Sequence, residues 1–573
     1  MSAIHKLKIA FRDTKAKAAL CAAAAAAVAF LAYSPAFDVP LLSDDWHLAW
    51  IAAHSTQPWF AYFWTNYAGT AVGYAYRPLQ IVYFLVANGL GGTDPLVYHL
   101  IQIGFHAANT ILVFVLARKL AGGKSLFLPT VASSLFALFP NHSEAVVWPS
   151  AIGDPTATFF MLVTVLAWIV GRKRRSLTFY ALSWVACVFA LASKDMAMSL
   201  PFIVAAWELL NLHQTGLVRQ VMKSACRVLP FFAILAAYFT IRLDATGYLF
   251  GYYGAPKVAF DPMVMVRTYL AIPVSHFVSG LTRTEVMDFL YRVVDTRVTA
   301  ATIAIVIAVI IFAARAGRKF WWLAVAFVVS IAPVAQLGLN HLPGRVSDEG
   351  ERYAYLPSVF LAIMLASAID AIRRRGKKLG TIVAVMSVAV LLITMTLQLE
   401  SKLGDWNAAG ALATKALTSW PDAYSTATTG KMFVVGLPDN YRGVPLWRNS
   451  LAEAHELVFG TKPDVTVTAL RTVIDRPHGF IVSDLGDDRW SYVSRLSDSP
   501  RADIVGLLSV AENGYSAKLG ERTFSIYALT YRDFSDSAEL SLRPWVDANP
   551  SSPTTAVFWK GEGWISRSVG AND

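Results

Sequence analysis

The chain has 573 residues, of which 55% are hydrophobic, 13% aromatic and only 16% charged, and its mean hydropathy is +0.46. These values lie outside the range of soluble proteins and exclude an ordinary soluble domain. The net charge of +11 would suggest nucleic-acid binding in a soluble protein, but here the excess lies in short loops between apolar segments, so it reports membrane orientation and predicts no nucleic-acid partner.

The N-terminal residues 1–17 are basic and precede an alanine-rich apolar run. Because this run is long and lacks a convincing cleavage site, we expect an uncleaved membrane anchor behind a cytoplasmic tail, not a signal peptide. Cys21, Cys187 and Cys226 lie within or beside apolar segments, so they predict no disulfide framework.

Apolar segments long enough to cross a hydrocarbon core of roughly 30 Å recur between residues 18 and 398. Placing the basic clusters in the cytoplasm gives about eleven transmembrane helices, with the N-terminus inside and the C-terminus outside a bacterial inner membrane. The expected spans lie near 18–36, 96–117, 125–140, 155–170, 177–192, 196–211, 228–243, 298–314, 320–338, 354–372 and 380–398.

Two further apolar segments, 78–90 and 263–281, are short or interrupted by polar residues. Counting either as a span would turn a basic loop outward, so we expect both to be interfacial helices on the outer face. The first of them belongs to an outer loop, 37–95, whose Tyr, Trp and Phe residues are typical of a membrane interface.

The membrane part is expected to cover residues 18–400, and a small extracytoplasmic α/β domain to cover 401–573. Apolar residues between Trp406 and Trp420 recur at near-helical spacing. Segments 432–437 and 524–531 are rich in strand-forming residues.

Asp44 and Asp45 follow the first span and lie against the outer surface of the membrane. Desolvation and mutual repulsion would raise the proton affinity of one of them, which suits a general base acting on a hydroxyl or amine. The alternative is a solvated start of a helix at Trp46.

Arg77 precedes Pro78 at the start of the first interfacial segment, where it would either contact a phosphate or anchor the chain at the interface. His99, Gln102, His106 and Asn109 form one polar stripe on the second span. Interhelical hydrogen bonding and ligand contact both explain such a stripe. Metal binding by the two histidines is disfavoured because they lie about two turns apart.

The loop between the third and fourth spans carries His142, Glu144, Trp148 and Asp154. A histidine and two carboxylates suit either a divalent cation or the orientation of an acceptor. No tight ligand signature accompanies them, so we expect no cofactor, and a metal bound by His142, Glu144 and Asp154 remains the alternative.

Some basic residues lie in the expected outer loops, although basic residues generally favour the cytoplasmic side of a membrane protein. Lys194 lies in a short outer turn, where it would pair with Asp195 or neutralise a phosphate. Arg345 and Arg352 precede the tenth span, which begins near Tyr355, and Arg352 suits either a phosphate or a structural ion pair. Acids, histidines and cations thus converge on one membrane face, as in a site with a carboxylate base and an anionic leaving group.

The order of these motifs resembles that of the C-type (GT-C) integral-membrane glycosyltransferases, over roughly residues 18–400. It is most similar to the protein O-mannosyltransferases, including their tetratricopeptide-carrying branch. The resemblance implies an inverting enzyme that moves a sugar from a polyprenyl-phosphate donor in the membrane lipid. The acceptor, whether protein, lipid or glycan, stays open because the C-terminal part departs from the tetratricopeptide branch.

By this resemblance Asp44 is the leading catalytic base, with Asp45 as its partner or substitute. The implied donor-phosphate residues are Arg77, Lys194, Arg345 and Arg352. The residues implied to contact or orient the substrate are His99, His106, Asn109, His142, Glu144, Trp148, Asp154 and Tyr355. Two alternatives remain: a transporter or flippase for a lipid-linked saccharide, and an oligosaccharide polymerase or ligase that uses a polyprenyl-pyrophosphate donor.

Overall fold

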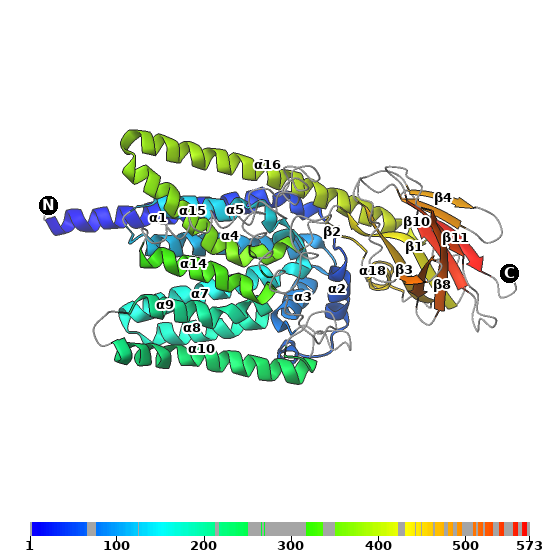
Figure 1. The fold of residues 1–573 in the computed structure, drawn as a ribbon, viewed down its shortest axis with the longest axis horizontal. Coiled ribbons are helices and arrows are strands. Elements are labelled where there is room, and N and C mark those ends of the chain that lie inside the picture. Colours follow the sequence, from blue (N-terminus) through cyan, green and yellow to red (C-terminus); the bar gives the residue numbers. More distant parts are fainter. Residues whose placement is uncertain are drawn as a thin grey trace.

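The computed structural model describes residues 3–65, 76–123, 125–212, 217–249, 265, 269, 317–335 and 350–421, and then 430–441, 443–447, 450–461 and the later strands named below. The predicted span 298–314, Arg345 and nearly all of the predicted interfacial segment 263–281 lie outside these residues. Helices form one end of the molecule and strands the other, and the two termini lie at opposite ends (Figure 1).

The first helices in chain order are α1 (Ala3–Ala32), η1 (Ser34–Asp38), α2 (Asp44–His54), η2 (Trp59–Phe63), α3 (Pro78–Gly91), α4 (Pro95–Leu120) and α5 (Phe127–Leu138). A buried connection follows, built of η4 (Pro140–His142), α6 (Ser143–Val147) and η5 (Pro149–Ala151). The remaining helices of the bundle are α7 (Gly153–Arg174), α8 (Leu177–Ser193), η6 (Asp195–Ser199), α9 (Leu200–Leu210), α10 (Leu217–Thr246), α14 (Arg318–Ile331), η7 (Ala332–Val334), η9 (Glu351–Ala354), α15 (Tyr355–Arg375) and α16 (Lys377–Thr418).

The chain is an α-helical, multi-pass membrane protein, as the sequence predicts. Six of the described helical segments are long and apolar enough to cross a membrane: Lys15–Asp38, Pro95–Leu120, Pro149–Arg174, Leu217–Thr246, Glu351–Arg375 and Lys377–Thr418. Other predicted spans correspond to shorter helices. The 12 residues of α5, for example, rise only about 18 Å.

The helix α5 is short because Phe139 precedes Pro140, and a residue before proline is disfavoured in a helix. The chain then runs from Pro140 to Ile152 as short helical turns that are buried among the other helices. The sequence predicts an outer loop here, and the structure shows a connection enclosed by protein instead. Its polar groups must therefore be satisfied by neighbouring helices.

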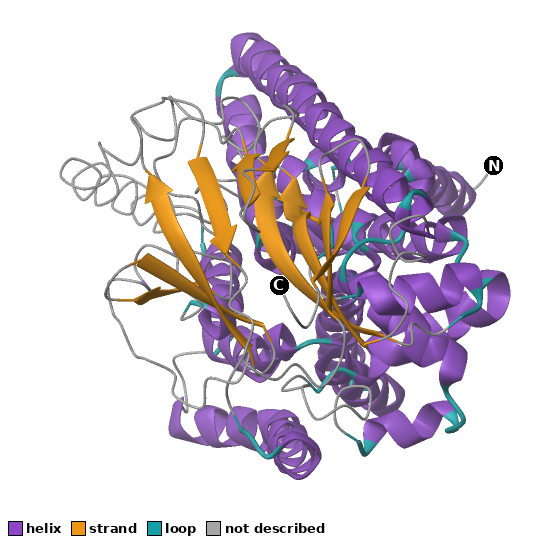
Figure 2. Ribbon diagram, turned by 90° about the vertical axis from the view of Figure 1, so that its right-hand side faces the viewer, coloured by secondary structure: helices purple, strands orange, loops and turns teal. Residues whose placement is uncertain are grey.

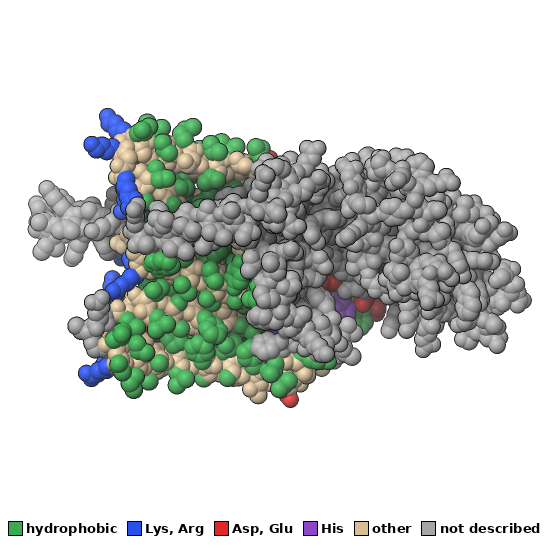
Figure 3. Space-filling model, in the orientation of Figure 1, with side chains coloured by type: hydrophobic (Ala, Val, Ile, Leu, Met, Phe, Trp, Pro, Cys, Tyr) green, Lys and Arg blue, Asp and Glu red, His purple; other side chains and the backbone are tan. Residues whose placement is uncertain are grey.

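Basic residues gather at the end of the bundle that lies away from the strands (Figure 3). They occupy the last turns of three long helices: Arg118 and Lys119 of α4, Arg172 to Arg174 of α7, and Arg373 to Arg375 of α15. Cations at helix C-termini also interact favourably with the helix dipole. The helical face between the two ends is largely apolar in Figure 3.

The strand-rich part contains two sheets. The first has the order β11–β10–β1–β2, with β3 also paired to β1, and its strands are β1 (Gly430–Tyr441), β2 (Val444–Pro445), β3 (Val465–Ile474), β10 (Thr554–Trp559) and β11 (Trp564–Val569). The second has the order β4–β5–β9–β8–β7–β6, with strands β4 (Phe480–Asp484), β5 (Trp490–Ser494), β6 (Leu508–Ala511), β7 (Gly514–Leu519), β8 (Arg522–Thr530) and β9 (Ala538–Arg543).

The pairing within the first sheet is mixed. Strand β1 runs parallel to β3 and to β10, whereas β2 and β11 are antiparallel to their neighbours. The predicted strands 432–437 and 524–531 fall on β1 and β8. One further helix, α18 (Leu451–Phe459), lies between the strands and the bundle (Figure 1). Figure 2 shows the strands in front of the helices.

Helix α16 connects the bundle to the strands as one element of 42 residues. The predicted boundary at residue 400 lies inside this helix, which runs on through the predicted helical stretch that follows Trp406. Trp406 and Trp420 are buried, so the outer end of α16 is packed on one side by protein. The helix thus continues across the predicted boundary at residue 400 without a break.

Candidate active site

Asp45 is held on all sides by the protein. It is fully buried, and its Oδ2 accepts the Leu42 N–H at 2.9 Å. Its Oδ1 accepts both the backbone N–H of Ser150 at 2.7 Å and the Ser150 hydroxyl at 2.5 Å. Burial outweighs these hydrogen bonds and raises the pKa of Asp45 to about 8. Both carboxylate oxygens already accept hydrogen bonds from the protein, so a substrate proton has no open access to them.

Asp44 differs from its neighbour. It lies in the first turn of α2 and is only partly buried, and its carboxylate has no hydrogen bond or ion pair within the described part of the chain. Neither aspartate caps α2 through its side chain, because the N-cap position belongs to Ser43. Of the two, Asp44 is the one available to a substrate.

The residue before Asp44 has an unusual backbone conformation. Ser43 has a φ of +51° and a ψ of −123°, in the region where residues other than glycine are rarely found. Such a conformation costs about 1–3 kcal/mol and persists only where the surroundings impose it. Here the Ser43 N–H donates to the carbonyl of Leu446, which lies in the C-terminal part, at 2.6 Å.

The polar stripe on α4 contacts backbone carbonyls of neighbouring segments. His99 donates from Nε2 to Val39 at 2.8 Å, and Gln102 donates from Nε2 to both Ala145 and Trp148 at 2.7 Å. These contacts provide hydrogen-bond donors for backbone carbonyls of the buried connection and of the segment before Asp44. The interhelical role is therefore the one that the structure supports for this stripe.

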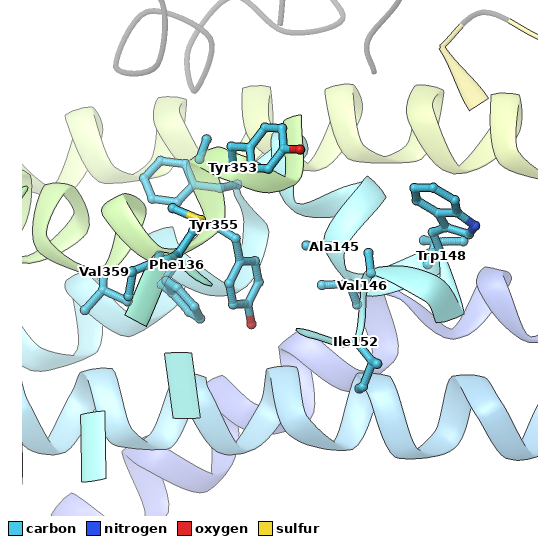
Figure 4. Close-up of a cluster of buried hydrophobic side chains, with 14 of the residues drawn as sticks. Phe136, Ala145, Val146, Trp148, Ile152, Tyr353, Tyr355 and Val359 are labelled. Carbon is cyan, nitrogen blue, oxygen red and sulfur yellow. The ribbon is translucent and has the colours of Figure 1, made fainter. Parts of the chain in front are cut away.

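Two residues of the same stripe meet Tyr355. Asn109 donates from Nδ2 to the Tyr355 hydroxyl at 3.2 Å and to the Pro155 carbonyl at 2.9 Å. His106 donates from Nε2 to the Ala137 carbonyl at 3.2 Å, so its Nδ1 accepts from the Tyr355 hydroxyl at 2.8 Å in the neutral ring. Figure 4 shows Tyr355 beside Phe136, with Ala145, Val146 and Trp148 of the buried connection across from them.

Two cations predicted to bind a phosphate lie in buried ion pairs. Lys194 contacts the carboxylate of Asp154, with its side chain only 3% exposed, and the alternative partner, Asp195, is not the one it uses. Arg352 contacts Glu144, which also accepts the backbone N–H groups of Gly350 and Arg352 at 2.9 Å. Glu144 therefore fixes the turn that carries Arg352.

Asp195 is surrounded by other groups instead. Arg242 donates to it at 2.6 Å and the Tyr238 hydroxyl at 2.7 Å, while the guanidinium of Arg77 lies 3.8 Å away. Arg242 is almost fully buried. Arg242 is not among the site residues predicted from the sequence. A lone arginine inside an apolar run is the signal that identifies it.

The two sets of cations are close together. Burial lowers the pKa of Lys194 to about 8; Asp154 opposes this shift, and the charges of Arg77 and Arg352 add to it. The ring of Tyr353 lies between two cations, 5.0 Å from the Lys194 ammonium and 4.8 Å from the Arg352 guanidinium. We call Arg77, Lys194, Arg242 and Arg352 the cation cluster.

The cation cluster brings four cations and three carboxylates together. The carboxylates are those of Glu144, Asp154 and Asp195. Guanidinium and ammonium groups that converge in this way can donate charge-assisted hydrogen bonds to an anion. The cluster is therefore suited to an anionic group such as a phosphate.

Trp148 lies between the cation cluster and residues 42–45, which we call the acidic turn. Its indole N–H donates to the Leu42 carbonyl at 3.3 Å, two residues before Asp44. Its ring lies 5.2 Å from the Arg352 guanidinium. The turn that carries Asp44 and the cation cluster thus share one neighbouring side chain.

His142, Glu144 and Asp154 do not form a ligand set. The ring of His142 donates from Nε2 to the Ser358 hydroxyl at 2.8 Å, whereas the two carboxylates contact Arg352 and Lys194. Among the described residues, no group of three or more His, Cys, Asp or Glu residues is arranged to hold a metal ion. The proposed metal alternative has no geometric support in these three residues.

Known proteins that resemble this chain are membrane glycosyltransferases. No family model matches the chain. The protein O-mannosyl-transferase tmtc2 of Xenopus laevis is 27% identical over 208 residues, which are 34% of this chain and 25% of that protein. The mouse TMTC2 protein is 30% identical over 132 residues, which are 22% of this chain and 16% of that protein. The predicted resemblance to protein O-mannosyltransferases is thus confirmed, over at most about a quarter of the relatives' length.

Among solved structures, the archaeal oligosaccharyltransferase AglB from Archaeoglobus fulgidus, in complex with an inhibitory peptide and a dolichol-phosphate, is 11% identical to this chain. The alignment covers 79% of this chain and 64% of that one, with a TM-score of 0.45. A likeness at this level carries no argument about mechanism.

Proposed function

We propose that this protein is an inverting glycosyltransferase that transfers a sugar from a polyprenyl-phosphate donor to an acceptor at the extracytoplasmic surface of the membrane. One observation carries the proposal: Asp44, whose carboxylate has no partner among the described residues, and the cation cluster are linked through Trp148. The names of the sequence relatives, which are O-mannosyl-transferases, support the same reaction.

In the proposed reaction, Asp44 takes a proton from a hydroxyl or amine of the acceptor. The acceptor atom forms a bond to the anomeric carbon of the sugar, and the bond from that carbon to the donor phosphate oxygen breaks with its electron pair on the phosphate. The cation cluster stabilises the negative charge that develops on this leaving group. Direct displacement inverts the configuration of the anomeric carbon.

The proposed orientation rests on the distribution of charge. The basic ends of α4, α7 and α15 lie at the end of the bundle away from the strands. With these ends in the cytoplasm, Asp44, the cation cluster and the C-terminal part face the extracytoplasmic side, and the N-terminus is cytoplasmic. A bacterial inner membrane is the proposed location.

The test uses the purified full-length chain in liposomes with defined polyprenyl-monophosphate sugars and an acceptor mixture from membranes. We expect mass spectrometry to find one sugar residue added to an acceptor, and NMR coupling constants of the product to show that the anomeric configuration is inverted. Transfer only from pyrophosphate-linked donors would instead indicate a polymerase or ligase. Movement of the lipid-linked sugar across the bilayer without any transfer would contradict the proposal and favour a flippase.

A further inference from the structure

Helix α18 of the C-terminal part lies along α2, the helix that begins with Asp44. Glu453 contacts the His47 ring at 3.1 Å. Glu456 accepts the Trp50 indole N–H at 2.7 Å and contacts the His54 ring at 3.2 Å. Positions 47, 50 and 54 lie on one face of α2. Acidic and histidine side chains gather where the bundle meets the strand-rich part in Figure 3.

The segment before α18 reaches the acidic turn itself. The Leu446 carbonyl accepts the Ser43 N–H at 2.6 Å, and Val444, Leu446 and Trp447 are all buried. This contact constrains Ser43, whose positive φ sets the direction in which Asp44 leaves the turn. The backbone on the other side of Asp44 is held by the hydrogen bonds of Asp45. Asp44 is therefore fixed through its neighbours, while its own carboxylate has no partner among the residues that the structure describes.

Helix α16 adds a third support. Gly410 lies so close to Pro40 that an added Cβ would be 2.5 Å from the proline Cδ. About two turns toward the membrane, Lys402 forms a buried ion pair with Glu351, the residue next to Arg352. The helix that leads into the C-terminal part thus contacts both the segment before Asp44 and the turn that carries Arg352.

We propose that residues 444–447 and 450–459 of the C-terminal part, which we call the strap, are a positioning element of the active site that holds Asp44 in its reactive geometry. The inference rests on the proposed function, in which Asp44 is the base. When the strap contacts are lost, Ser43 relaxes from its positive φ and the Asp44 carboxylate moves relative to the acceptor. A displacement of about 1 Å at a reacting group lowers turnover by about 100-fold.

The experiment measures sugar transfer by the full-length chain with Glu453 and Glu456 both changed to alanine. The matched control is Glu400→Ala, which removes an exposed carboxylate of α16 outside the site. We expect kcat to fall by at least about tenfold, since the base is misplaced, with the KM for the donor changed by less than about twofold, since the cation cluster is intact. The double glutamine variant, whose amide oxygens still accept from Trp50 and His47, is expected to recover most of the activity.

Gly410→Ala is the second variant, because it displaces α16 from Pro40 without touching α18. It should show the same fall in kcat at constant donor KM. A purely structural role would lower the amount of folded protein but leave the kcat of the folded fraction unchanged in both variants. Wild-type kcat in both would overturn the strap proposal alone. A wild-type protein that transfers no sugar would overturn the proposed function, and the strap with it.

Discussion

The acidic turn and the cation cluster are built in opposite ways. In the acidic turn, the residues on either side of Asp44 are tied to the protein, but the Asp44 carboxylate has no partner among the described residues. In the cation cluster, Lys194, Arg242 and Arg352 each already contact a carboxylate. Asp44, as the proposed base, needs a carboxylate without a partner, whereas buried cations need counter-charges when the proposed donor is not bound. In the proposed reaction, the phosphate of the donor therefore competes with Glu144, Asp154 and Asp195 for these cations.

The largest stability effect is expected from breaking one pair in the cation cluster. Lys194→Ala leaves Asp154 buried without its counter-charge, which costs about 3–5 kcal/mol of folding free energy. The double variant Lys194→Ala with Asp154→Ala removes both charges and should recover much of this loss. Thermal unfolding of the two variants in the same detergent checks the prediction. Equal stability of the single and double variants would show that the pair is not coupled.

A smaller effect separates the two aspartates. Asp45→Ala leaves the N–H groups of Leu42 and Ser150 buried without acceptors and should lower the free energy of unfolding by about 1–3 kcal/mol. Asp44→Ala removes no contact and should change it by less than about 0.5 kcal/mol. Thermal unfolding of both variants gives the comparison. A greater loss for Asp44→Ala would contradict the different roles assigned to the pair.

The smallest effect concerns pH. Lys194 has its pKa lowered to about 8, so it carries its charge below this pH and loses it above. Binding of a polyprenyl phosphate should therefore weaken as pH rises through 8, by about tenfold at most between pH 7 and pH 9, since about a tenth of Lys194 still carries its charge one pH unit above its pKa. Lys194→Arg stays charged and should bind with little change over this interval. Titration of both proteins at pH 7 and pH 9 distinguishes them.

The sequence predicts the regions of the site better than the contacts within them. Apolar periodicity locates α1, α4 and α15, and the exception to the charge rule identifies Lys194 and Arg352 as functional candidates. The partner of Lys194 lies 40 residues away and the partner of Asp45 lies 105 residues away. Such pairings depend on how helices pack, which spacing along one chain does not encode.

The C-terminal part shows the same limit. The sequence suggests strands near 432–437 and 524–531, and the structure has strands there, but nothing in α18 alone indicates that it contacts α2. Glu453 and Glu456 look like ordinary surface carboxylates of a short helix. Only the long-range contact with His47, Trp50 and His54 gives them a role.

The most direct test of the account compares sugar transfer by the wild-type chain and by Asp44→Asn. The amide keeps the size of the side chain and removes the base, so turnover should fall by about 100-fold to 10,000-fold. Binding of the donor lipid and thermal stability should stay at wild-type values, because the cation cluster and the hydrogen bonds of Asp45 are unchanged. Wild-type turnover by Asp44→Asn would contradict the central claim that this unpaired carboxylate is the catalytic base.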